Sequence, residues 1–138
     1  MECVFCRIVE GEEKAYIVYE DRDILVILDK YPISKGHLLV IPKDHYESIV
    51  DAPREIVRRV FEIAWVFAKI YRERLQAPGV RVLTNSGRQA GQDIFHFHVH
   101  VIPYWSRFTT RGVLTRREAK EVLAMLDTHK DILRILEQ

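Results

Sequence analysis

Three histidines stand at alternate positions in the segment His96-Phe97-His98-Val99-His100-Val101-Ile102. Side chains along a β-strand alternate between its two faces, so this spacing predicts that His96, His98 and His100 share one face. The apolar residues between them are expected on the opposite face, against the core. Imidazole titrates near neutral pH and serves as nucleophile, general acid, general base or metal ligand. The row of three therefore indicates a chemical site.

From the residues alone, two other interpretations of this row remain open. A plain polar strand face is the first, but three imidazoles in strict alternation give little packing in return for their desolvation. A single metal bound by all three histidines is the second. Because residues rise about 3.3 Å along a strand, the Cα atoms of His96 and His100 lie about 13 Å apart. Without a bulge, one metal spans at most a pair at positions i and i+2.

Cys3 and Cys6 form a Cys-x-x-Cys pair. One such pair is a partial zinc signal, because a tetrahedral site needs four ligands. The competing interpretation is a thioredoxin-like redox pair, which follows a strand and opens a helix. No strand is predicted before this pair, which favours the metal.

Segments rich in β-branched and aromatic residues must position these groups. They predict five strands, at residues 16–20, 24–29, 36–41, 80–85 and 95–103. The first two read as an antiparallel hairpin around a polar turn. Residues 86–92 contain two glycines and are expected to form a loop before the histidine strand.

Two helices are predicted beside the strands. Apolar residues recur at helical spacing over 53–76, with Asp51 as the expected N-cap and Pro53 in the first turn. Thr115 and Glu118 form a capping box at the start of a helical C-terminal tail. Together the segments predict an α+β fold: a mainly antiparallel five-stranded sheet, one long helix and the tail.

The bulk numbers limit the function classes. The chain has 138 residues, which suits a single domain over 1–138, and its net charge is +1 with histidines neutral. Nothing in that charge points to nucleic acid or to a membrane surface. The apolar runs are short and no signal peptide is recognised, so the expected location is cytoplasmic, where both cysteines stay reduced.

The sequence resembles the histidine triad (HIT) family. Its signature, three histidines alternating with apolar residues and followed by a second apolar residue, is matched at every position of 96–102. Three further segments resemble the family: Cys-Val-Phe-Cys-Arg-Ile-Val-Glu-Gly-Glu at 3–12, Gly-His-Leu-Leu-Val-Ile-Pro-Lys-Asp-His at 36–45, and Asn-Ser-Gly-Arg-Gln-Ala-Gly-Gln at 85–92. The motifs cover residues 3–105, while the tail, 106–138, carries none.

The resemblance implies a reaction at the α-phosphate of a purine nucleotide conjugate, either a nucleoside phosphoramidate or a dinucleoside polyphosphate. The central histidine, His98, is the nucleophile and forms a covalent nucleotidyl-histidine intermediate, which water hydrolyses. Fixed donors must meet the phosphate charge. The candidates are His100, Asn85, Gln92 and the backbone N–H groups around Gly91, with His37 as a helper.

The same resemblance implies the nucleoside pocket, the metal and the partner. Asp29 accepts hydrogen bonds from the ribose, and Phe5, Ile8 and Ile27 sandwich the base. Asp93 departs from the family pattern, because many relatives have Ser or Thr there, and an ionised carboxylate would disfavour anionic leaving groups. A structural zinc ion is expected on the four residues Cys3, Cys6, His45 and His96.

The resemblance also implies a homodimer, for which the outer side of the 53–76 helix, with Trp65 and Phe67, is the expected contact. A nucleotide-binding sensor or scaffold with only residual hydrolase activity is the alternative function. Turnover of a phosphoramidate by the wild type and by His98→Ala separates the two functions.

Overall fold

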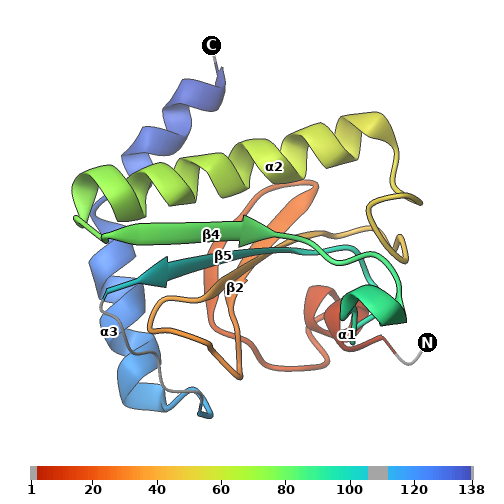
Figure 1. Ribbon diagram of the computed structural model, residues 1–138, viewed down its shortest axis with the longest axis horizontal. Coiled ribbons are helices and arrows are strands. Elements are labelled where there is room, and N and C mark those ends of the chain that lie inside the picture. The colour runs from red at the N-terminus through yellow and green to blue at the C-terminus, as the bar shows by residue number, and fades with distance from the viewer. Residues whose placement is uncertain (1–2, 106–111, 138) are drawn as a thin grey trace.

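A computed structural model describes residues 3–105 and 112–137, and its centre is a single antiparallel sheet. The strand order is β1-β2-β3-β5-β4, and every neighbouring pair is antiparallel (Figure 1). The strands are β1 (Ile17–Glu20), β2 (Ile24–Leu28), β3 (Leu38–Pro42), β4 (Gly79–Leu83) and β5 (Val99–Tyr104). The α+β class and the five-stranded sheet are therefore as the sequence predicts.

Apolar clusters cover both faces of the sheet. The long helix α2 (Arg54–Lys69), continued by the π-helical turn η1 (Ile70–Arg74), packs on the face that carries Phe97, Val99 and Val101. The short helix α1 (Val4–Val9) packs Phe5 on the other face, against a smaller cluster made of Leu25, Ile27, Leu39 and Ile41. Because both faces are covered, every residue of β2 and β3 is buried.

Two details of the long helix differ from the sequence predictions. Pro53 rather than Asp51 occupies the N-cap, and it makes no side-chain capping bond. The Asp51 carboxylate instead accepts hydrogen bonds from the N–H and the hydroxyl of Ser48, at 3.1 and 3.0 Å. Phe67 is fully buried, so it does not lie on the outer side of the helix as predicted, whereas Trp65 is 50% exposed. Helical spacing aligns Phe67 with Ile63 and Ile70, which face the sheet.

The C-terminal part of the described chain consists of α3 (Arg116–Asp127) and the 3-10 helix η3 (Lys130–Glu137). Thr115 is the N-cap of α3, and its hydroxyl accepts a hydrogen bond from the Glu118 N–H at 3.1 Å, as predicted. Apolar residues of α3 and η3 pack on the α2 side of the sheet. Residues 106–111 of the predicted tail lie outside the described residues.

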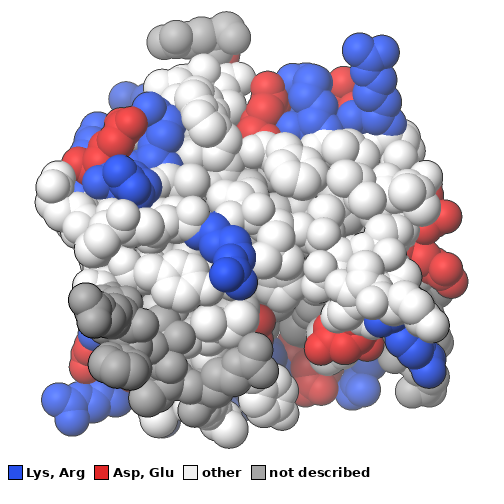
Figure 2. All heavy atoms as spheres, viewed as in Figure 1, with Lys and Arg blue, Asp and Glu red and all other residues white. Residues whose placement is uncertain are grey.

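Charged side chains are distributed unevenly over the face seen in Figure 1. Figure 2 shows both signs of charge mainly toward the outline of this face, while its middle, over β4 and β5, is mostly uncharged. Among the described residues, no helix combines the length and the apolar character that crossing a membrane requires.

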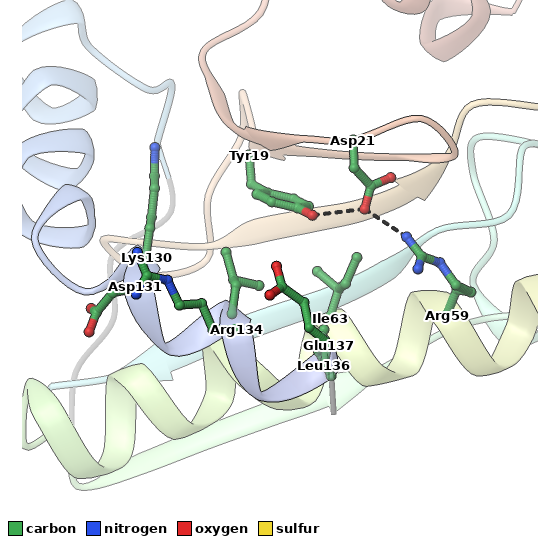
Figure 3. Close-up of a pocket in the computed structure, with 10 residues that line it drawn as sticks. Tyr19, Asp21, Arg59, Ile63, Lys130, Asp131, Arg134, Leu136 and Glu137 are labelled. Atoms are coloured by element: carbon green, nitrogen blue, oxygen red, sulfur yellow. Dashed lines mark hydrogen bonds and ion pairs between the residues drawn. The ribbon is translucent and has the colours of Figure 1, made fainter.

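A pocket of about 600 Å³ lies between β1, α2 and η3 (Figure 3). At one side of it Asp21 joins two elements. Its carboxylate oxygen Oδ2 accepts from the Tyr19 hydroxyl at 2.8 Å and from Nη2 of Arg59 at 2.7 Å. We call these three residues the Asp21 cluster.

Candidate functional site: a histidine site beside a metal group

The histidine segment enters the sheet later than predicted. β5 begins at Val99, not at residue 95, because the Phe97 N–H donates to the Tyr46 carbonyl, at 2.6 Å, instead of to a neighbouring strand. The backbone nevertheless keeps its alternation. Phe97 is buried in the α2-side core, while the rings of His96 and His98 contact the Phe5 ring on the other side, with centroids 5.6 and 5.1 Å away.

His98 is held with one nitrogen fixed. Its Nδ1 lies 2.7 Å from the His96 carbonyl oxygen. A carbonyl only accepts, so Nδ1 carries the hydrogen and Nε2 carries the lone pair. Burial lowers the pKa of His98, against the opposing effects of that hydrogen bond and of the charges of Asp93 and Asp29. A neutral imidazole with a free Nε2 lone pair is the nucleophilic form of histidine.

His100, His37 and Asp29 form a chain beside the His98 ring. The rings of His98 and His100 lie 4.9 Å apart, and His100 Nδ1 lies 2.9 Å from His37 Nε2. That same His37 nitrogen lies 3.3 Å from Oδ2 of Asp29. Burial, with smaller effects from the charges of His98 and His37, lowers the pKa of His100 to about 3, so His100 stays neutral. The structure thus brings the predicted helper, His37, against the third histidine of the row.

Gln92 shapes the loop that precedes the histidines. Its side-chain oxygen accepts from the Gly87 N–H at 2.8 Å, and its amide nitrogen donates to the carbonyls of Glu47 and Ile94, at 2.5 and 3.2 Å. Within the loop, Gly91 has φ 96°, a conformation that favours glycine. A Cβ at Gly91 would lie 3.4 Å from Nδ2 of Asn85, so the loop also packs closely on that side chain.

The remaining predicted site residues lie at the edges of this region. Asp29, at the end of β2, accepts the Tyr31 N–H on Oδ1 at 2.8 Å. Phe5 and Ile27 are buried in the α1-side cluster, and Ile8 is partly buried against it. Asp93 is exposed, yet its charge raises the pKa of His98.

Four potential metal ligands converge at the N-terminal end of this region. The Sγ atoms of Cys3 and Cys6 and the Nδ1 atoms of His45 and His96 all lie within 4.8 Å of one another. The separations are 3.3 Å for Cys3–His96, 3.4 Å for Cys6–His45, 3.6 Å for Cys6–His96 and 3.2 Å for His45–His96. A tetrahedral zinc ion with Zn–S near 2.3 Å and Zn–N near 2.0 Å sets S···N edges of about 3.5 Å and N···N edges of about 3.3 Å. The donor set therefore fits zinc.

The surroundings of these donors fit the same ion. His96 Nε2 donates to the Pro42 carbonyl at 2.8 Å, which leaves its Nδ1 lone pair for a metal. Burial lowers the pKa of His96 to about 4, which keeps the ring neutral. In the absence of a cation, burial and the neighbouring Cys3 raise the pKa of Cys6 to about 11. A bound divalent ion would displace that proton, because thiolates are the metal-binding form.

One element of this group escapes the sequence patterns. Cys3 is the N-cap of α1, and its Sγ accepts the Cys6 N–H at 3.3 Å. A six-residue helix is too short to show clear apolar periodicity, so only its cap and the Cys-x-x-Cys spacing could have indicated it. Both cysteines are free thiols, so they form no disulfide.

The fold and the site together are typical of one class of protein: an antiparallel sheet presents three histidines on one side, of which His96 and His98 are buried, beside a Cys₂His₂ group. The model of the HIT domain family matches residues 10–106, and the chain belongs to that family. A HIT-like protein of Saccharolobus solfataricus is 40% identical over 105 residues, covering 76% of each chain.

Solved structures agree with this assignment. A histidine triad nucleotide-binding protein of Sulfolobus tokodaii superposes with a TM-score of 0.87 at 36% identity, covering 96% of this chain and 94% of the other. A zinc-bound histidine triad protein of Mycobacterium smegmatis gives a TM-score of 0.78 at 38% identity, covering 93% and 97%.

Proposed function

We propose that this protein is a nucleotide hydrolase or nucleotidyl transferase that acts at the α-phosphate of a purine nucleotide conjugate, with His98 as the nucleophile. The observation that carries the proposal is the hydrogen bond from His98 Nδ1 to the His96 carbonyl. It orients a neutral ring so that only Nε2 can attack. Burial of the same ring keeps it unprotonated near neutral pH.

The reaction has two displacements at phosphorus. In the first, the Nε2 lone pair of His98 forms a P–N bond, and the bond to the leaving group breaks with its electron pair. In the second, a water oxygen attacks the same phosphorus, the P–N bond breaks and His98 is restored. A departing amine takes up a proton from solvent in the first step, and the attacking water releases a proton to solvent in the second, so the protons balance. Dividing one displacement into two lowers each barrier and predicts retention at phosphorus.

The phosphate oxygens need donors that are already in place. We assign this role to His100 and to Asn85. The backbone N–H groups around Gly91 are also candidates from the sequence, but those of Ala90, Gly91 and Gln92 already donate to carbonyl groups within the loop, at 3.1, 3.0 and 3.1 Å. Gln92 contributes by holding the loop in shape, since its amide groups bond to Gly87, Glu47 and Ile94. A loop fixed in this way loses little conformational entropy when a phosphate binds.

The nucleoside would then occupy the α1 side of the sheet. Asp29 is the acceptor for the ribose hydroxyls, and one oxygen of its carboxylate lies beside His37. Phe5, Ile8 and Ile27 form an apolar wall for the base. Apolar walls read no base edge, so weak discrimination between bases is expected, with a preference for the larger purines.

The names of two relatives support an enzymatic role. An Arabidopsis thaliana protein named adenylylsulfatase HINT3 is 38% identical over 102 residues, which are 74% of this chain and 52% of that protein. A structure from Legionella pneumophila is described as a HIT family hydrolase and is 35% identical, with a TM-score of 0.65. An adenylyl sulfate is itself a nucleotide conjugate, in which sulfate is joined to the α-phosphate.

Zinc on Cys3, Cys6, His45 and His96 has a structural role in this proposal. The four protein donors complete a tetrahedral shell, which leaves no position for substrate. The ion would fix α1, and therefore Phe5, against the histidine segment. The His96 carbonyl, which orients His98, belongs to one of the ligands.

Direct detection of the intermediate tests the proposal. Zinc-loaded protein is mixed with adenosine phosphoramidate and quenched after milliseconds in alkaline denaturant, because a phosphorus–nitrogen bond to histidine is labile to acid. Mass spectrometry should find one adenylyl group on His98 and none in His98→Ala. Nucleotide binding without an adduct or turnover would contradict the proposal and leave the sensor function.

We further propose a homodimer. Trp65 on α2 and Val82 on β4 are 50% and 40% exposed, and the two elements contact each other. β4 is an edge strand, so one side of its backbone has no partner among the described strands. Light scattering at micromolar concentration should give twice the chain mass of 16.3 kDa, and a monomer would contradict the dimer.

A further inference from the structure

Asp29, His37 and His100 offer three ligand atoms within 4.8 Å of one another. By residue type and distance, these three residues could also form a second metal site. Hydrogen positions decide what this group can do. The Ile33 N–H donates to His37 Nδ1 at 3.0 Å. The Nδ1 atom that receives this bond carries a lone pair, so the hydrogen of a neutral His37 ring is on Nε2.

The environment of His37 Nε2 agrees with this assignment. The two atoms nearest to it in the group are Oδ2 of Asp29, at 3.3 Å, and Nδ1 of His100, at 2.9 Å. A carboxylate oxygen can only accept. The lone pair that a metal would need at Nε2 is absent unless the ring gives up the bond from Ile33. The group therefore fits a directed hydrogen bond better than it fits a metal.

The position of the hydrogen on His37 determines the tautomer of His100, the third histidine of the row. His37 Nε2–H donates to His100 Nδ1, so a neutral His100 carries its own hydrogen on Nε2. His98, two residues earlier, has the opposite arrangement, because its Nδ1 donates to the His96 carbonyl. Adjacent rings, 4.9 Å apart, thus present an Nε2 lone pair and an Nε2–H donor.

We propose that His37 is a positioning residue, which holds His100 as the Nε2–H tautomer and so places a hydrogen-bond donor beside the His98 nucleophile. The source of this order is a backbone group, the Ile33 N–H, which is present for every residue type at position 33 except proline. The role of the donor rests on the proposed function: His100 Nε2–H hydrogen-bonds a phosphate oxygen during attack and keeps its proton. The tautomers themselves do not depend on the reaction.

Nitrogen-15 spectra of the histidine rings in zinc-loaded protein test the tautomers directly. At neutral pH the wild type should show His98 protonated at Nδ1 and both His37 and His100 protonated at Nε2. A His100 ring protonated at Nδ1 would overturn the proposal. So would a second equivalent of zinc whose binding removes the His37 Nε2 proton. This measurement needs no variant and no activity.

Two variants test the consequence. His37→Gln keeps an N–H donor for His100, whereas His37→Leu has a similar volume and none. In His37→Leu, His100 should become a mixture of tautomers and kcat should fall about 10²-fold, the usual loss for one preorganised donor. KM for the nucleotide should change little. His37→Gln should regain most of kcat, and equal kcat in the two variants would overturn the proposal. Correct tautomers in a protein that forms no adduct would instead count against the proposed function alone.

Discussion

The histidine site and the Asp21 cluster are both polar networks that join distant segments, but they are built differently. In the histidine site, three neutral rings each bond to a backbone group: the Pro42 carbonyl, the His96 carbonyl and the Ile33 N–H. In the Asp21 cluster a charge pair, Asp21–Arg59, makes the connection, and both side chains are partly exposed. A ring nitrogen of histidine can donate or accept, so in the histidine site the backbone groups decide which nitrogen carries the hydrogen. The Asp21 carboxylate also accepts hydrogen bonds from two backbone N–H groups, those of Asp23 and Ile24, but a carboxylate has only this one role.

The pocket beside the Asp21 cluster has no group prepared for catalysis among the residues that line it. Its basic residues Arg59, Lys130 and Arg134 are balanced by three acidic residues, Asp21, Asp131 and Glu137 (Figure 3). Burial and the hydrogen bond to Asp21 raise the pKa of Tyr19 to about 12, so its hydroxyl stays protonated. The pocket offers neither net charge nor an activated nucleophile, although its volume would admit a ligand.

The largest effect is expected on turnover, which should depend on the histidine site and not on the Asp21 cluster. His98→Ala should lower turnover of adenosine phosphoramidate by about 10³-fold or more, as loss of a nucleophile does. Its melting temperature should change by only a few degrees. Steady-state kinetics and calorimetry on the same preparation measure both. Asp21→Asn is the matched control and should keep full turnover; normal turnover in His98→Ala would end the assignment of the nucleophile.

Zinc removal should have the next largest effect, on stability. Chelation should lower the melting temperature by roughly 10 °C, which corresponds to a loss of about 3 kcal/mol in a domain of this size. Elemental analysis should find one zinc per chain before chelation and none after it. Zinc affinity should fall as pH falls, because protons compete for the thiolates. Cys6→Ser should bind zinc less tightly, and an unchanged melting curve after complete chelation would contradict the structural role.

The Asp21 cluster should show a smaller effect with a defined pH dependence. Burial alone would raise the pKa of Asp21, but bonds from Tyr19, from the N–H groups of Asp23 and Ile24, and from Arg59 outweigh it and lower this pKa. A depressed pKa in the folded state contributes stability above the unfolded pKa and loses it as pH falls through the folded value. Asp21→Asn should therefore cost about 1 kcal/mol at pH 7.

Urea unfolding of the wild type and Asp21→Asn measures this difference. The gap between the two free energies of unfolding should begin to close as pH falls below the pKa of an unfolded aspartate, about 4, and should be closed below the lower pKa of folded Asp21. Arg59→Met is the companion variant, because it removes the charge partner and leaves Asp21 in place. A gap that stays constant with pH would show that packing, and not charge, connects β1 to α2.

The smallest effect is expected at Asp93, which lies outside both networks but acts on His98. Two unit negative charges about 4 Å apart repel by about 1 kcal/mol in water, which corresponds to roughly fivefold in rate. Asp93→Ser should shift the ratio of kcat/KM values by that order toward dinucleoside polyphosphates and away from phosphoramidates. The acid limb of the pH profile should move to lower pH, since the Asp93 charge raises the pKa of His98. Asp93→Asn controls for size. Unchanged kcat/KM ratios would show that Asp93 faces the solvent and does not influence the choice of leaving group.

The sequence could predict features that are written within one segment. Strand alternation placed Phe97 in the core and the histidines opposite it, and the Thr115 cap follows from a four-residue pattern. Asp51 and Phe67 were predicted wrongly for a physical reason. A helical pattern gives a period but not the orientation of the helix, and an Asp before a helix has several donors to choose from.

The hydrogen-bond partners that give the site its chemistry lay beyond such patterns. The Pro42 carbonyl and the Ile33 N–H are backbone groups, and every residue except proline carries both kinds. Only the fold brings them to the rings of His96 and His37. Motif spacing can therefore name the residues of the site, while the direction of each bond requires the structure.

His96 takes part in two tasks with two different atoms. Its ring belongs to the metal group, and its carbonyl oxygen holds His98. Substitution of His96 by any other amino acid replaces the ring but keeps the backbone carbonyl. Alanine scanning therefore cannot test the carbonyl that holds His98. Replacing the amide between His96 and Phe97 by an ester weakens this acceptor, because an ester carbonyl accepts more weakly, and it also removes the Phe97 N–H that donates to the Tyr46 carbonyl. The ring proposed as the nucleophile is thus aligned by a group that point mutation leaves in place.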